Sequence, residues 1–553
     1  MADSSLSGEL ATLSQRLWSK IEPLLRSNCR SARQRSQLLA MQNWLRKYHI
    51  SEQEPPLVQV QGLLEAFHHG CDGDFWEVAD LIARLAIAGE STLIEQIGRW
   101  GDYGQQRQMG DRLLRDANGS DSFYPLILGQ AHYGLSDYAQ AQMCYQHCLA
   151  GLQASGADKA ASTENCKRVL SALAGLGNVC RSQGRYGEAQ DFYAQQLQEA
   201  QHLADVAAEG AAWGNLGTLA QVTGRYPEAV GYHQRYLEVC VTQGNRHGQC
   251  AALDNLGLAY RALGQMAEAL DCHRRSLAIA QAIKSPYDEA GAWGNLGLVQ
   301  LSQGDYDAAI VHFQRQLQLS QTIENRYGEA TAQGNLGIAY YYQQQFAAAQ
   351  AALNHQLAWA HRLGDVRSEG AALGNLGLVY EAQQDFTAAI AAHQEQLALF
   401  AAMGYQQGRK NALGNLGNAY YRLGELSKAE QYHRDCLALA QQLGEVRGIA
   451  ASWGNLGHVL FAQRAYRSAL ECYEASLEKF RQVGDRWSIG RALSHQGEAL
   501  LRLAQPVAAI QAFEAAFAIA QQVADTTTVA LVCQKLAMLT LRDKYTPKAD
   551  KSC

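Results

Sequence analysis

The chain has 553 residues, 18% of them charged, and a formal net charge of −6, a balance that argues against a nucleic-acid-binding protein, which is usually basic. No apolar run approaches the roughly 20 residues that a membrane span needs. The first residues, MADSSLSGELATLSQ, lack the layout of a secretory signal. We therefore expect the thirteen cysteines in a reducing cytoplasm, and because none shows paired CxxC spacing, we expect no metal site.

The first 119 residues predict a helical N-terminal domain that also caps the rest of the chain. Apolar residues recur at helical spacing over residues 7–25, 31–49, 55–70 and 74–89. Residues 97–114 resemble a degenerate half of the repeat that follows.

A repeat of forty residues then dominates the sequence. Its marker is the tetrapeptide GNLG or DNLG, whose asparagine we take as position zero. A glycine follows at +2, an aromatic or bulky apolar residue at +11 and an alanine at +14. The seven asparagines are Asn215, Asn255, Asn295, Asn335, Asn375, Asn415 and Asn455.

This pattern predicts a helical hairpin in each unit. The first helix carries the asparagine and ends near +9, where four units have a glycine that suits a helix C-terminus. The second helix carries the alanine, and the small residues at +2 and +14 allow the two helices to approach closely. Neither helix can bury its apolar face alone, so neighbouring units must stack.

The same register continues on both sides of the seven perfect copies. It gives ten units over residues 120–522, followed by a C-terminal capping helix and tail over residues 523–553. We therefore predict an all-α solenoid.

The pattern Trp213…Leu216-Gly217…Gly224-Arg225-Tyr226…Ala229 resembles the tetratricopeptide repeat (TPR). The forty-residue length and the NLG core are most similar to the Pins/LGN subclass, with kinesin light chain more distant, and the composition is similar to bacterial, especially cyanobacterial, TPR proteins. The resemblance implies a right-handed superhelix that binds other proteins. No G-protein-binding motif follows the repeats and no long heptad coil precedes them, so neither relative's full function carries over.

Helical geometry places positions −4, 0, +3 and +7 on one stripe, which in the TPR family lines the concave groove. The −4 residues are small or short, and most +3 residues are Leu or Ile, so the groove would combine a low floor, an apolar wall and a row of amides. A carboxamide both donates and accepts, which matches an extended peptide backbone. The alternative is that each asparagine bonds the neighbouring repeat and fixes the stacking angle.

Large side chains at the end of the first helix are candidate anchors for a partner, because a few aromatic and arginine residues carry most interface energy. They gather in the later units. The candidates are Tyr341, Tyr342, Tyr421, Arg422 and Phe461.

Position +18 holds His233, His273, His393 and His433 but an aromatic or leucine elsewhere, which favours packing over metal binding. Five arginines begin the first helices of successive units, where they could pair with an acidic partner or remain solvated: Arg246, Arg326, Arg367, Arg447 and Arg486. The chain has no P-loop, HExxH or GxSxG motif, so we expect no catalytic residue and no cofactor.

The sequence thus favours a non-catalytic scaffold, an adaptor or assembly factor, that holds an extended protein or peptide segment in its groove. The alternative is a signalling receptor that tightens around a regulatory peptide, with the N-terminal helices as its effector. Neither hypothesis requires nucleic acid or an integral membrane segment, although a membrane-bound partner is compatible with both.

Overall fold

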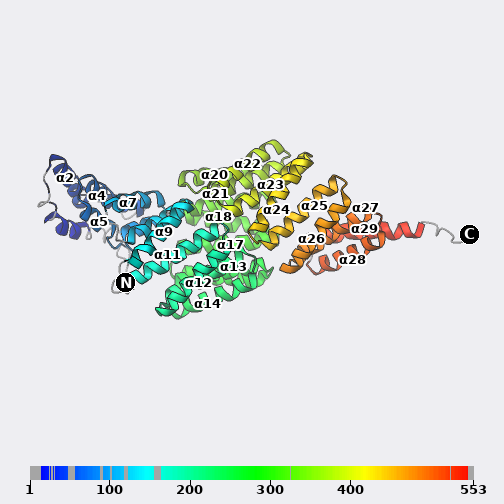
Figure 1. Ribbon diagram of the computed structural model, residues 1–553, viewed down its shortest axis with the longest axis horizontal. Coiled ribbons are helices and arrows are strands. Elements are labelled where there is room, and N and C mark those ends of the chain that lie inside the picture. Colours follow the sequence, from blue (N-terminus) through cyan, green and yellow to red (C-terminus); the bar gives the residue numbers. More distant parts are fainter. Residues whose placement is uncertain are drawn as a thin grey trace, which may run out of the picture.

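The computed structural model describes residues 14–23, 25, 29, 31–47, 56–87, 91–99, 102–116, 122–154, 163–323, 325–523 and 525–545. These residues form helices joined by short turns, with one isolated β-bridge between Ala86 and Thr92. The helices follow one another as packed hairpins along an elongated molecule, with the N-terminal helices at one end and α29 (Thr526–Tyr545) at the other (Figure 1). The predicted all-α TPR-type solenoid is confirmed.

The N-terminal helices share one apolar core with the first hairpin. Met41, Phe67 and Ile94 are buried in this core together with Ile127, which belongs to α8. The helices are α2 (Ala32–Lys47), α3 (Pro56–Gln59), α4 (Gln61–Asp72), α5 (Trp76–Ala83), α6 (Leu93–Arg99) and α7 (Tyr103–Asp116). The helix expected over residues 74–89 is shorter than predicted. The chain leaves helical geometry at Arg84, so that residue 86 can pair with residue 92.

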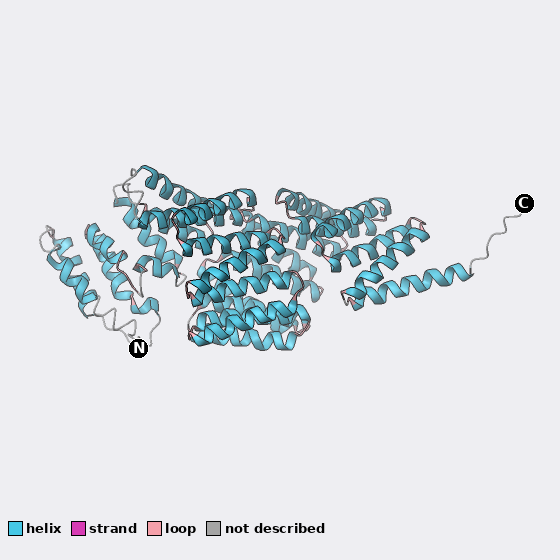
Figure 2. Cartoon of the chain, turned by 90° about the horizontal axis from the view of Figure 1, so that it is seen from below, coloured by secondary structure: helices cyan, strands magenta, loops and turns pink. Residues whose placement is uncertain are grey.

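Ten hairpins follow in the part of the chain that the structure describes. In each of them the first helix packs against the second, and the second packs against the helix that follows it (Figure 2). Their helices are α8 (Phe123–Gly134) and α9 (Tyr138–Ala154), α11 (Thr163–Ser182) and α12 (Tyr186–His202), α13 (Val206–Val222) and α14 (Tyr226–Thr242), α15 (Arg246–Ala262) and α16 (Met266–Ala282), α17 (Pro286–Gln303) and α18 (Tyr306–Thr322), α19 (Arg326–Tyr342) and α20 (Phe346–Leu363), α21 (Val366–Ala382) and α22 (Phe386–Ala402), α23 (Gln406–Leu423) and α24 (Leu426–Gln442), α25 (Val446–Ala462) and α26 (Tyr466–Val483), and α27 (Arg486–Arg502) and α28 (Pro506–Gln522). The last helix, α29, packs on α28 through Val532. The boundaries at residues 120 and 523 stay a prediction, and residues 546–553 of the expected tail lie outside the described residues.

The turn inside each hairpin requires a left-handed residue at +9. Gly304 adopts φ 82° there and Gly424 adopts φ 85°. Where the sequence lacks glycine, the backbone is left-handed all the same, as at Gln344 (φ 60°) and Arg464 (φ 66°). The packing of the two helices therefore fixes this conformation, and glycine only makes it less costly.

The glycine at +2 makes room for the side chain at +18 of the same hairpin. A Cβ on Gly417 would lie 2.5 Å from Cε1 of His433, and one on Gly297 would lie 2.5 Å from Cε1 of Phe313. All four histidines at +18 are buried. The prediction that these histidines pack rather than bind metal is thus supported by their positions, although they are fully rather than half buried.

The solenoid winds until hairpins from successive turns touch. Arg367 of α21 donates to the hydroxyl of Tyr138 and, at 3.2 Å, to that of Ser182, across 229 and 185 residues. The Tyr186 hydroxyl donates to Oε1 of Gln407 over 3.5 Å, across 221 residues. Separations of 221 and 229 residues correspond to between five and six forty-residue units, so one superhelical turn closes onto the next.

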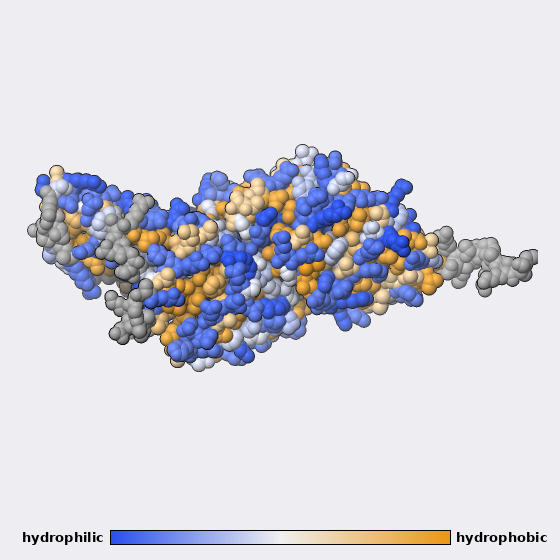
Figure 3. Space-filling view, in the orientation of Figure 1, coloured by the Kyte–Doolittle hydropathy of each residue, from blue (hydrophilic) through white to orange (hydrophobic). Residues whose placement is uncertain are grey.

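Hydrophilic residues are distributed over the visible surface and along the helices. On the face in Figure 3, hydrophobic residues lie in separate patches among hydrophilic ones. Within the described part of the chain, every helix is too short or too polar to traverse a bilayer.

Candidate functional site

The seven predicted asparagines all lie on first helices, partly buried, in a row along the array. Two of them bond the preceding hairpin. Nδ2 of Asn215 donates to Oε1 of Gln196 over 3.0 Å, and Nδ2 of Asn335 donates to Oε1 of Gln316 over 3.3 Å. Among the described residues, the other five carboxamides have no hydrogen-bonding partner. The stacking role therefore has direct contacts at two positions, and five amides remain available.

Three of these five amides converge on one pocket, which we call the amide pocket. It has a volume of about 450 Å³ and lies on α21, α23 and α25. Asn375, Asn415 and Asn455 line it, joined by Asn411 and Asn418 from positions −4 and +3 of the middle helix. Its floor is low because small residues stand beneath the amides, at Ala371, Gly374, Gly414 and Ala451. The pocket thus brings small residues and asparagines from three hairpins together, and their role in binding stays a prediction.

A buried lysine, which the sequence prediction missed, lies in the wall of this pocket. Lys410 forms an ion pair with Glu445, and only small fractions of both side chains are exposed. The two opposite charges of this pair neutralise each other. The carboxamides of the amide pocket therefore lie in nearly neutral surroundings. The sequence contained a signal for it: the equivalent position in the other NLG units holds only Gly, Ala or Cys.

A smaller cavity of about 210 Å³ continues from the amide pocket and shares Ala451 and Asn455 with it. The rings of His458 and His495 lie 4.3 Å apart in its wall. Burial and the neighbouring His495 and Arg491 lower the pKa of His458 to about 3, and burial and Arg491 lower that of His495 to about 4. Both imidazoles are therefore neutral at physiological pH.

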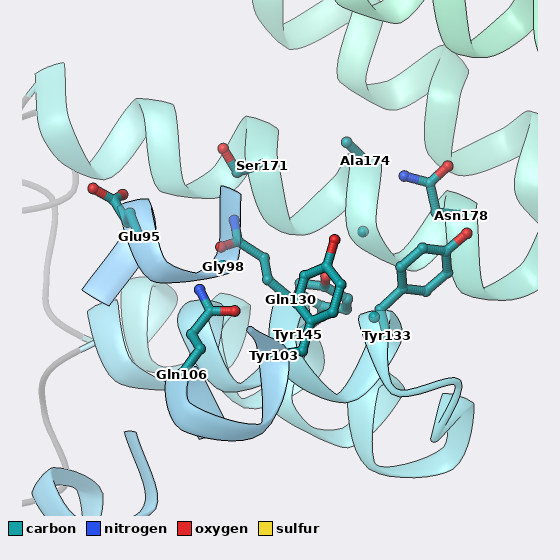
Figure 4. A pocket seen from close by; sticks show the side chains of 12 residues that line it. Glu95, Gly98, Tyr103, Gln106, Gln130, Tyr133, Tyr145, Ser171, Ala174 and Asn178 are labelled. Carbon is teal, nitrogen blue, oxygen red and sulfur yellow. The ribbon is translucent and has the colours of Figure 1, made fainter. Parts of the chain in front are cut away.

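A second pocket of about 450 Å³ lies at the N-terminal end of the array, and we call it the tyrosine pocket (Figure 4). Its three tyrosines come from different helices: Tyr103 from α7, Tyr133 from α8 and Tyr145 from α9. Helices α6 and α11 complete it with Glu95 and Asn178. Unlike the amide pocket, it joins the N-terminal helices to the repeats.

The tyrosine pocket contains an unused acceptor. Only 1% of Gln106 is exposed, and its Oε1 has no hydrogen-bonding partner. Glu95, by contrast, is already engaged, since its Oε2 accepts from the backbone N–H and hydroxyl of Thr92 at the start of α6. A ligand that donates a hydrogen bond to Gln106 would satisfy a buried polar atom that otherwise costs stability.

With the repeats and pockets established, comparison with known proteins identifies the family. The model of the tetratricopeptide repeat matches residues 168–236, 207–282, 288–358, 368–442 and 448–522. These segments span more than half of the chain. The chain belongs to the tetratricopeptide repeat family.

Three solved structures match parts of the chain at low sequence identity. BtubC (BKLC) from P. vanneervenii is 22% identical, with a TM-score of 0.33 over 39% of this chain and 90% of that one. A Rap protein in complex with competence and sporulation factor is 13% identical, with a TM-score of 0.41 over 61% and 98%. A putative kinesin light chain from Podospora anserina is 18% identical, with a TM-score of 0.30 over 34% and 94%. No curated protein matches the chain.

The predicted anchors lie outside the amide pocket of this TPR array, at the turn end of the first helices. The Tyr342 ring stacks on Tyr306 at 5.5 Å and is 52% exposed. Tyr341 is half-buried against a core cluster formed by α20 of its own hairpin and α21 of the next, and its ring lies 6.2 Å from that of Phe346 on α20. Position +6, which Tyr341 occupies, is therefore partly a packing position.

The other three anchors differ in exposure. Tyr421 is 38% exposed and Arg422 is also exposed, so both are accessible to a partner. Phe461 is half-buried, and its ring contacts Tyr466 at 5.2 Å. A role for these residues in binding stays a prediction.

The residues that the structure describes contain no group of three or more His, Cys, Asp or Glu side chains placed to hold a metal ion. The arginines at the starts of the first helices have mostly internal partners. Arg367 bonds across the superhelical turn, Arg447 pairs with Asp485 at 2.8 Å and Arg326 pairs with Glu329 at 2.7 Å. The sequence could not show the partners of Arg367, because they lie about five units away.

Proposed function

We propose that this TPR protein is a non-catalytic scaffold, an adaptor or assembly factor, which holds an extended segment of a partner protein along its concave face. The observation that carries the proposal is the amide pocket. Asn375, Asn415 and Asn455 approach one space from three successive hairpins, and their carboxamides have no partner among the described residues.

The chemistry of the amide pocket fits a peptide main chain. A peptide presents alternating N–H donors and C=O acceptors, and each carboxamide supplies both complements. Small residues on the floor, such as Ala371 and Ala451, let a backbone approach closely, while Leu378 offers an apolar contact. The pocket therefore suits recognition of backbone more than of a particular side chain. The finer resemblance to the Pins/LGN subclass and a cytoplasmic location are parts of this proposal.

A receptor function is the second candidate, and the tyrosine pocket favours it. A ligand in that pocket would contact Tyr103 and Gln106 of the N-terminal helices and Tyr133 and Asn178 of the repeats together. Binding could then change how the N-terminal helices rest on the array, which is what an effector requires.

The test is a comparison of partner capture by the wild-type chain and by the variant Asn375→Ala/Asn415→Ala/Asn455→Ala. Partners captured by the wild type are identified by mass spectrometry, and the bound segment is mapped by a photo-crosslinker placed at Ala451 on the pocket floor. The mapped segment, made as a synthetic peptide, should bind the triple variant at least about tenfold more weakly.

The matched control carries Gln314→Ala and Asn354→Ala, which remove exposed amides from the second helices α18 and α20. It should bind the peptide as the wild type does. Equal affinity of the triple variant and this control, with both folded by circular dichroism, would exclude the amide pocket as the binding site. Hydrogen exchange at residues 93–116 with and without peptide separates the two candidates, because only a receptor should respond there.

A further inference from the structure

A cavity of about 940 Å³ lies between two successive turns of the superhelix. One wall is formed by the turns that follow α13, α15 and α17, with Tyr226 and Arg261. The opposite wall is formed by the starts of α25 and α27 and the end of α28, with Arg447 and Trp487. Its size is within the range of small-molecule sites, and it shares only Trp487 with the smaller cavity beside the amide pocket.

The lining of this inter-turn cavity is strongly basic. Three arginines, Arg261, Arg447 and Arg486, meet there, and Asp485 is the one carboxylate among the lining residues. Asp485 already has partners, since it pairs with Arg447 at 2.8 Å and accepts from the backbone N–H of Ser488 at 3.1 Å and from the Ser488 hydroxyl at 2.9 Å. Arg261 and Arg486 are left without an acidic partner in the lining. This local excess contrasts with the net charge of −6 for the chain.

The unfavourable effect of this excess positive charge is clearest at Arg261. Its Nη1 donates to the hydroxyl of Ser302 over 3.3 Å, but its Nε is buried with no partner. Burial lowers the pKa of Arg261. Arg486 likewise has a neutral partner, Oε1 of Gln522 at 3.2 Å. Removing a guanidinium from water without a counter-charge is unfavourable, so an anion would relieve Arg261 and would give the exposed Arg486 an acidic partner.

We propose that this cavity binds a phosphate-bearing small molecule that bridges the two turns. Guanidinium groups present paired N–H donors that match phosphate oxygens, and Arg261 and Arg486 face the cavity from opposite turns. The ring of Trp487, which is 48% exposed, and that of Tyr226 supply apolar faces for an organic group.

Because the ligand touches both turns, its binding stabilises the closed superhelix over any more open form. The cavity shares no lining residue with the amide pocket. The proposal is therefore independent of the peptide-binding function, and it provides a way for a small molecule to set the width of the groove.

Titration calorimetry with the full chain tests the proposal, using pyrophosphate, magnesium-free ATP and inorganic phosphate as probes and citrate at equal ionic strength as the comparison anion. Saturable binding of pyrophosphate or ATP, stronger than that of citrate, is expected. The variant Arg261→Met/Arg486→Met should bind about tenfold or more weakly. The control Arg502→Met removes an exposed arginine from the far end of α27 and should bind as the wild type does.

A measurement on the unmutated chain supplements the variants in case they fold poorly. Pyrophosphate should slow hydrogen exchange at residues 261–266 and 483–487 and leave residues 371–382 unchanged. The proposal is overturned if no phosphate compound binds saturably, if citrate binds equally well, if the folded double variant keeps wild-type affinity, or if residues 261–266 and 483–487 gain no protection.

Discussion

The amide pocket and the tyrosine pocket are equal in volume but are built in different ways. In the amide pocket the same residue type arrives three times, at Asn375, Asn415 and Asn455, from equivalent positions of consecutive hairpins. In the tyrosine pocket each wall has a different origin, with Tyr103 from an N-terminal helix and Tyr133 from the first hairpin. A perfect repeat produces a row of identical groups, which suits a partner's repeating backbone. At the end of the array, where the repeat sequence becomes irregular, each helix contributes a different chemical group to the pocket.

The difference extends to the buried side chains beneath the pockets. At position +18 the first two hairpins have Tyr145 and Tyr193, whereas the hairpin under the amide pocket has His433. The two ends of the array therefore differ in how they respond to acid as well as in what they can bind. The following experiments test this contrast, beginning with the largest expected effect.

Acid should destabilise the C-terminal end of the array more than the N-terminal end. Burial lowers the pKa of His433 from 6.5 to about 4. It also lowers the pKa of His458 to about 3 and that of His495 to about 4. Below pH 6.5 the unfolded chain binds protons that these buried imidazoles do not bind in the folded chain. The contribution of the neutral imidazoles to the free energy of unfolding is therefore fully present above pH 6.5 and is lost as the pH drops toward 4. For His433 alone the loss at about pH 5 is on the order of 2 kcal/mol.

Hydrogen exchange at neutral and acidic pH measures this effect. Exchange at acidic pH should accelerate in α23–α27 more than in α8–α11. His433→Phe should reduce the acid loss, since phenylalanine already occupies the equivalent site at Phe313. Uniform acid sensitivity along the array would contradict the prediction.

The amide row should dominate partner binding. Three lost hydrogen bonds at about 0.5–1.5 kcal/mol each predict a loss of about 1.5–4.5 kcal/mol for Asn375→Ala/Asn415→Ala/Asn455→Ala. Asn215→Ala/Asn335→Ala should instead reduce the free energy of unfolding, because these amides bond Gln196 and Gln316. Isothermal titration and chemical denaturation separate the two outcomes. Unfolding of the triple variant would show that the amides serve only stacking.

The two glycines of one GNLG motif should respond oppositely to alanine. A Cβ on Gly417 would lie 2.5 Å from His433, so Gly417→Ala should lower the free energy of unfolding by about 1–3 kcal/mol. At Gly414 the nearest atom, Sγ of Cys436, is 3.6 Å away. Gly414→Ala should therefore be neutral or stabilise by up to about 1 kcal/mol through helix propensity. Urea denaturation of both variants measures the difference, and equal losses would rule out the close approach at +2.

The exposed anchors should contribute least. Tyr421→Ala should weaken partner binding by about 1 kcal/mol without loss of stability, because the side chain is 38% exposed. Tyr341→Ala should weaken binding and also lower the thermal midpoint, since Tyr341 packs on a core cluster. Gln221→Ala, from the early units, should leave affinity nearly unchanged. Equal small losses in all three would mean that the C-terminal half of the groove has no anchor.

Much of the fold could be predicted because its determinants lie within forty residues of one another. The alanine at +14, the glycine at +2 and the left-handed residue at +9 all act inside one hairpin, so their period is visible in the sequence. The amide row could be predicted for the same reason. The tyrosine pocket could not, because Gln106 and Tyr133 come from segments without the full motif.

The sequence by itself determined the helical hairpins, their stacking and the side of each first helix that bears the asparagines, since local packing and helical periodicity dictate them. Only the tertiary structure decided how far the array winds. A small rotation between neighbouring hairpins, repeated five or six times, brings Arg367 to Tyr138 and Arg447 close to Tyr226. No residue pattern within one unit encodes the total rotation over several hairpins, because each rotation depends on how a pair of helices packs together. The inter-turn cavity with Arg261 and Arg486 exists only because the turn closes.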